Sequence, residues 1–70
     1  MNNERLELHR AAAWDFLLNE VLVSEDALNI VTDVAGYSYN TLELVLYSVT
    51  GYNDFIDYAE DNEIDMTNYL

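Results

Sequence analysis

The chain has 70 residues, enough for a single domain over residues 1–70. It contains no cysteine, which excludes disulfides and thiolate metal sites, and its hydrophobic content of 51% is too high for a disordered acidic tail. Fourteen Asp and Glu residues against two arginines and no lysine give a formal net charge of −12. Such a surface repels nucleic acid and anionic membranes, and its complement is a basic protein surface.

A long N-terminal helix is predicted over residues 4–20. Asn2 or Asn3 can cap it, and three consecutive alanines, 11–13, favour helix strongly. Its predicted buried face recurs at helical spacing and consists of Leu6, Ala13, Trp14, Leu17, Leu18 and Val21. The chain starts without a basic region followed by an apolar run, and no apolar run is long enough to span a membrane, so we expect a cytoplasmic protein.

A second helix is predicted to start at Ser24, whose hydroxyl can cap it, and two acids follow in the first turn. Gly36 is expected to close this helix in the left-handed conformation, with Tyr37 making a hydrophobic contact just beyond it. The predicted buried side of this helix is Ala27, Leu28, Ile30, Val31, Val34 and Ala35.

A third helix is predicted up to Gly51, with Asn40 as its cap. Within residues 42–49 the leucines at 42, 44 and 46 occupy alternate positions, so a strand is the alternative. Turn and cap signals at both ends favour a helix. The expected buried stripe is Leu42, Val45, Leu46 and Val49. Asn53 or Asp54 caps a fourth, short helix, after which Ile64, Met66, Tyr69 and Leu70 can dock as a last turn.

These elements predict an all-α fold, a compact bundle of one long N-terminal helix and three short helices. Two similar units, 34–37 and 49–52, each read Val-x-Gly-Tyr, and we interpret both as helix endings. The layout of residues 25–60, with Ala35-Gly36-Tyr37 after its first helix, resembles a ubiquitin-associated domain, which has Met-Gly-Phe/Tyr there. This resemblance implies a three-helix core.

Catalysis is not expected. His9 is the only histidine, and the chain has neither a Gly-x-Ser-x-Gly elbow nor a phosphate-binding glycine loop. The C-terminal carboxylates do not match the spacing of a calcium-binding loop. We therefore predict no enzyme activity, no cofactor and no dedicated metal site.

A partner-binding surface is the better prediction. Trp14, Phe16 and Phe55 are assigned to the core, whereas tyrosines near the glycines are candidate anchors, because tyrosine is common at interface hot spots. The predicted partner-binding residues are Asp54, Asp57, Glu60, Asp61, Glu63, Asp65, Glu4, Glu7, Tyr37 and Tyr52.

In size, charge and helical character the chain resembles short acidic proteins of bacteriophages and mobile elements, some of which inhibit host nucleases. This resemblance implies an inhibitor that imitates DNA in the basic channel of a CRISPR effector or restriction enzyme, within the host cytoplasm. The alternative is a small interaction or assembly module, in which an apolar or tyrosine-rich face binds another protein or a second copy of the chain.

Overall fold

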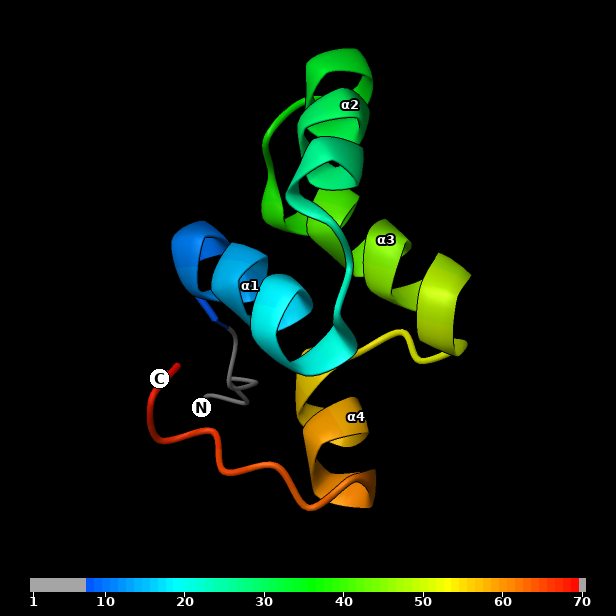
Figure 1. The fold of residues 1–70 in the computed structure, drawn as a ribbon. Helices are drawn as coiled ribbons and strands as arrows, with labels where there is room; N and C mark the ends of the chain where they lie inside the picture. The colour runs from blue at the N-terminus through cyan, green and yellow to red at the C-terminus, as the bar shows by residue number, and fades with distance from the viewer. Residues whose placement is uncertain (1–7, 70) are drawn as a thin grey trace, which may run out of the picture.

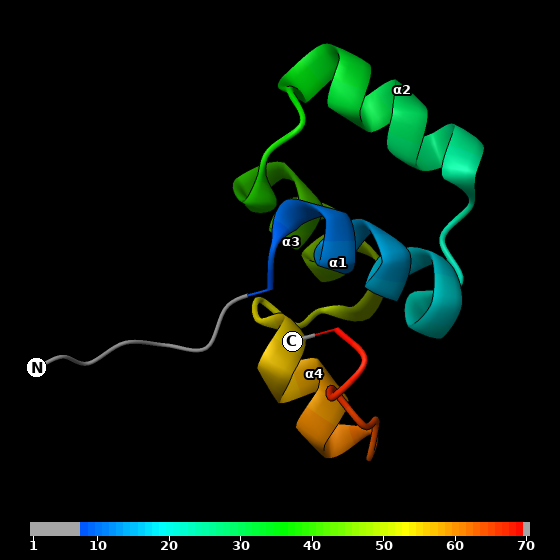
Figure 2. The same ribbon diagram turned by 90° about the vertical axis from the view of Figure 1, so that its left-hand side faces the viewer.

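The structure is a computed structural model that describes residues 8–69, and within this range every regular element is helical. The elements are α1 (Arg10–Phe16), the π-helical η1 (Leu17–Val21), α2 (Glu25–Ala35), α3 (Tyr39–Thr50) and α4 (Phe55–Asp61). In both ribbon views α1 and α3 occupy the middle, α2 covers one end and α4 the other (Figures 1 and 2). The all-α prediction is confirmed.

The N-terminal helix differs from its prediction. It begins at Arg10, because His9 has an extended backbone (ψ 158°), and continues without a break into η1. Leu8, just before it, is 4% exposed and belongs to the core. The prediction of one helix over residues 4–20 is therefore wrong at residues 8 and 9, and α3, with 12 residues, is the longest α-helix of the described part. Residues 2–7, with the predicted caps Asn2 and Asn3 and with Leu6, Glu4 and Glu7, lie outside the described range.

Aromatic packing around Phe16 joins α1 to the C-terminal third of the chain. The Phe16 ring is fully buried and makes edge-to-face contacts with Phe55, Tyr58 and Tyr69 at centroid distances of 5.5, 6.0 and 5.1 Å. Trp14 is only partly buried against this core. The assignment of Phe16 and Phe55 to the core is confirmed. The buried core consists of Leu8, Ala13, Phe16, Leu17, Leu28, Leu42, Val45, Leu46, Phe55 and Ala59.

α2 buries much less than its pattern predicts. The Ser24 hydroxyl caps it as expected, accepting from the Ala27 N–H at 3.1 Å. Leu28 alone is fully buried, whereas Ile30 and Val34 are 65% and 84% exposed. The prediction failed because α2 lies across one end of the molecule, where the other helices face it from one side only (Figure 2). Ala27 and Ala35, also predicted as buried, are exposed.

α3 is a helix throughout, which excludes the strand alternative. Its cap is Ser38, whose hydroxyl accepts from the Thr41 N–H at 3.2 Å, so the prediction of Asn40 as the cap is wrong. Leu42, Val45 and Leu46 are buried as predicted. Val49 is 56% exposed, because the last turn of α3 extends past the elements that cover its start.

The two glycines end their helices with different backbones. The N–H of Gly36 donates to Thr32 O at 2.9 Å and that of Gly51 to Tyr47 O at 2.8 Å. Gly51 is left-handed as predicted (φ 83°, ψ 0°), but Gly36 has φ 99° and ψ 149°, so its predicted left-handed helical conformation is wrong. Both positive φ values suit glycine. The extended ψ of Gly36 directs the chain towards α1, where Tyr37 contacts Trp14.

Three of the four residues predicted to dock at the C-terminus do so, and the fourth, Leu70, lies outside the described residues. Two residues after the end of α4, Glu63 has a left-handed conformation (φ 57°), and the Ile64 N–H donates to Ala59 O at 2.8 Å. Ile64, Met66 and Tyr69 are partly buried against the core. The Tyr69 hydroxyl donates to Glu20 Oε2 at 2.9 Å, which ties the end of the chain to η1.

Asp54 is the N-cap of α4, and its carboxylate accepts from the Ile56 N–H at 2.7 Å and the Asp57 N–H at 3.4 Å. We expect Asp54→Ala to lower the free energy of unfolding by about 1 kcal/mol, and Asp54→Asn to lower it much less, because asparagine caps as well as aspartate. Urea unfolding followed by circular dichroism measures both. The two variants remove the same charge, so equal stabilities would contradict a capping role.

Candidate functional site

Five exposed carboxylates form what we call the C-terminal acidic surface. Three of the carboxylates lie on α4 at positions i, i+3 and i+4 and therefore share one face of the helix. The other two lie after α4, where the chain turns back. The members are Asp57, Glu60, Asp61, Glu63 and Asp65. Asp54, also predicted here, is half-buried and directs its carboxylate to the α4 N-terminus.

Hydrogen bonds fix two carboxylates of this surface. The Tyr52 hydroxyl donates to Asp61 Oδ2 at 2.7 Å, and this bond to a carboxylate raises the pKa of Tyr52. The Thr67 hydroxyl and N–H donate to Asp65 Oδ1 at 2.7 and 2.9 Å, and these bonds lower the pKa of Asp65. Both carboxylates are therefore held in position while their charge stays in contact with solvent.

Arg10 is placed at Tyr37, away from the acidic surface. Between residues 8 and 69 the chain has one arginine, Arg10, and no lysine. Its guanidinium donates to Tyr37 O at 3.0 Å and lies 4.7 Å from the centroid of the Tyr37 ring. In the described part of the chain, the C-terminal acidic surface therefore keeps its charge without an arginine partner.

The structure separates the two predicted tyrosine anchors. Tyr52 adjoins the C-terminal acidic surface through its bond to Asp61 and is half-buried, with its ring 5.3 Å from that of Tyr58. Tyr37 is 44% exposed and lies between α1 and α2, where its ring meets that of Trp14. Glu4 and Glu7, the remaining predicted residues, lie outside the described residues.

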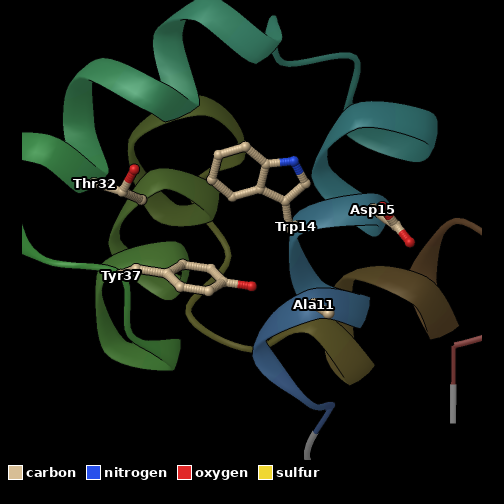
Figure 3. Close-up of a pocket in the computed structure, with 5 residues that line it drawn as sticks. All are labelled: Ala11, Trp14, Asp15, Thr32 and Tyr37. Carbon is tan, nitrogen blue, oxygen red and sulfur yellow. The ribbon is translucent and has the colours of Figure 1, made fainter.

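A groove opens between α1 and α2, and we call it the aromatic groove (Figure 3). Its volume is 440 Å³, and its walls include Trp14 and Tyr37, whose rings stand edge to face at 5.8 Å. Asp15 lies at the rim with its carboxylate directed outwards (Figure 3). Ala11 and Thr32 complete the lining. Sequence reasoning missed this groove because it assigned Trp14 to the core.

A second depression, of 540 Å³, lies along α3. Leu44 and Tyr47, 66% and 53% exposed, give it an apolar side. We call this the α3 outer face, and it is lined by Asn40, Glu43, Leu44, Tyr47 and Asn53. The signal for it was present in the sequence, since positions 40, 44 and 47 share one side of a helix.

The described residues include the groups considered for catalysis and metal binding. No three histidine, aspartate or glutamate side chains among residues 8–69 are grouped as a metal ion would require. His9 is exposed at the start of α1. Over the same residues no helix has the length and apolar character needed to cross a membrane.

Two tyrosines are expected to ionise above their ordinary pKa of 10.0. The Asp61 carboxylate raises the pKa of Tyr52, and burial, with a smaller contribution from Glu20, raises that of Tyr69. Folding thus favours the neutral phenols, so their contribution to stability is complete below pH 10.0 and is lost as the pH rises above it.

An absorbance titration of tyrosinate formation measures this. We expect Tyr52→Phe and Tyr69→Phe each to remove amplitude from the late part of the curve, and Asp61→Asn to move the Tyr52 transition towards lower pH. If the part of tyrosinate formation that occurs at high pH is unchanged in both phenylalanine variants, the prediction is wrong.

Comparisons with known protein families, with curated proteins and with solved structures give no match to this chain. Its own geometry thus supplies three surfaces on which a function can be based: the C-terminal acidic surface on α4 and the turn after it, the aromatic groove between α1 and α2, and the α3 outer face.

Proposed function

We propose that this protein is an acidic inhibitor, without enzymatic activity, that binds the basic nucleic-acid-binding surface of a host defence protein. The proposed target is a CRISPR effector or a restriction enzyme, and the mechanism is imitation of DNA charge. The observation that carries the proposal is the C-terminal acidic surface, with five exposed carboxylates between residues 57 and 65.

The close grouping of these carboxylates supports the mechanism. Neighbours at i+3 and i+4 on a helix have Cβ atoms about 5–6 Å apart, so Asp57, Glu60 and Asp61 form a compact row of charge on α4. Duplex DNA carries one charge per roughly 1.7 Å of its axis. A groove lined by lysine and arginine for such a polyanion can accept a row of carboxylates in its place.

The charge of the whole chain supports the same class of partner. A formal net charge of −12 on so small a protein produces a field that extends beyond its surface. This field attracts a basic surface over long range and accelerates the encounter, while it repels nucleic acid and anionic lipid. A protein that competes with DNA needs this property.

Neutralising the acidic surface tests the proposal. We expect Asp57→Asn/Glu60→Gln/Glu63→Gln to weaken binding to the captured partner about tenfold, because each exposed ion pair contributes about 0.5 kcal/mol. The partner is captured from the native host with the immobilised wild-type protein at low and high salt, and affinities are then measured with the purified partner. Added duplex DNA should compete.

A control with the same change in charge uses α2, where Glu25→Gln/Asp26→Asn/Asp33→Asn removes three exposed acids. This variant should retain most of the affinity, because its acids lie at the opposite end of the molecule (Figure 1). Partner binding that is indifferent to salt and to competing DNA, or equally weakened in both triple variants, would count against the proposal.

The second candidate function is an assembly or interaction module without DNA mimicry. It is favoured by the α3 outer face, where Leu44 and Tyr47 are exposed. Exposed apolar patches of this kind mark interaction sites in many proteins.

Sedimentation velocity distinguishes self-association from the first proposal. We expect a monomer at low salt, because two chains of charge −12 repel each other. A dimer that forms at low salt and dissociates in Leu44→Ser/Tyr47→Ser would favour the assembly module. The matched control is Ile30→Ser/Val34→Ser, which alters the exposed apolar pair on α2 instead.

A further inference from the structure

We propose that the aromatic groove receives one bulky apolar side chain of the partner, from a segment in which lysine or arginine flanks that side chain. This inference rests on the proposed function and specifies it: the acidic surface supplies attraction, and the groove supplies the contact that selects a sequence. The occupant is defined by its chemistry, an apolar residue such as leucine within a basic segment.

The walls of the groove suit an apolar occupant. Trp14 and Tyr37 present ring surface at right angles, and the small side chain of Ala11 leaves the space beside them open (Figure 3). The Thr32 hydroxyl already donates to Leu28 O at 2.8 Å, so it is satisfied within α2. Tryptophan and tyrosine are the residues most often found at interface hot spots, where they surround an anchor from the partner.

The charges around the groove indicate what flanks the anchor. Arg10 holds its guanidinium 4.7 Å from the Tyr37 ring centroid, so a cation placed inside the groove beside Tyr37 would meet a fixed positive charge. Asp15 directs its carboxylate outwards from the rim (Figure 3). An apolar side chain inside, with a cation outside the rim near Asp15, satisfies both constraints.

A second copy of this chain is a poorer occupant. Two copies would bring together net charges of −12 each, and the described residues contain a single arginine to offset them. A basic segment is complementary to the same field. Charge complementarity therefore selects the partner, and the walls of the groove select the side chain at its centre.

Trp14 is the only tryptophan, so its emission reports on the groove directly. The probes are three peptides: acetyl-Lys-Lys-Leu-Lys-Lys-amide, the same peptide with serine at the centre, and acetyl-Ser-Ser-Leu-Ser-Ser-amide. Fluorescein-labelled copies give affinity by anisotropy, and unlabelled copies are used for Trp14 emission. At low salt we expect the basic leucine peptide to shift Trp14 emission and to bind about tenfold more tightly than the other two.

Filling the groove is the matched test. Ala11→Leu adds bulk at an exposed lining residue, and we expect it to abolish the emission shift and to reduce the affinity of the leucine peptide to that of the serine peptide. Ala27→Leu makes the same change at an exposed position of α2 outside the groove lining and should change neither. Asp15→Asn should weaken the two basic peptides, with the emission shift retained at saturation.

The outcomes separate this inference from the proposed function. If the basic leucine and serine peptides bind equally, or bind without any change in Trp14 emission, the groove is not the anchor site, although the acidic surface still binds a basic partner. If neither basic peptide binds at low salt, both the groove inference and the proposed electrostatic function are overturned.

Discussion

The fold depends on the burial of one aromatic side chain, Phe16. Its ring contacts Phe55 and Tyr58 of α4 and Tyr69 of the C-terminal segment, so Phe16 joins α1 to the last third of the chain. Each such aromatic pair contributes about 0.5–1.5 kcal/mol beyond the burial of its area. These contacts oppose the mutual repulsion of the acidic side chains that the same segment carries.

This arrangement explains why the acidic surface can be rigid. Apolar residues of α4 and of the segment after it face inward, and the carboxylates between them consequently face solvent. Tyr52 and Thr67 then fix individual carboxylates by hydrogen bonds. A rigid row of charge pays less entropy on binding than a mobile acidic tail, which is an advantage for a protein proposed to imitate a stiff polyanion.

α2 is attached to the molecule by fewer buried side chains than α4. It is fixed to the remainder of the molecule chiefly through Leu28 and half-buried neighbours, and its separation from α1 creates the aromatic groove. The Arg10 guanidinium donates to Tyr37 O, which links the loop after α2 to α1. Under our proposals the two ends of the molecule have separate tasks, attraction at α4 and side-chain recognition beside α2.

The sequence by itself determined the all-α class, the glycine ends of α2 and α3, the cap of α2 and most of the core. Hydroxyl and carboxylate caps act locally, so Ser24 could be identified from its immediate neighbours and the cap of α4 narrowed to Asn53 or Asp54, whereas the start of α1 and the cap of α3 were wrongly placed. Phe16 and Phe55 could be assigned to the core from apolar spacing. Tertiary structure alone decided which apolar faces are covered. Val34 and Val49 fit their helical stripes yet remain exposed, because burial needs a facing element and so small a chain has too few. Spacing along the chain also does not show which distant side chains meet. The contact of Trp14 with Tyr37 and the separation of Tyr37 from Tyr52 therefore followed only from the tertiary structure.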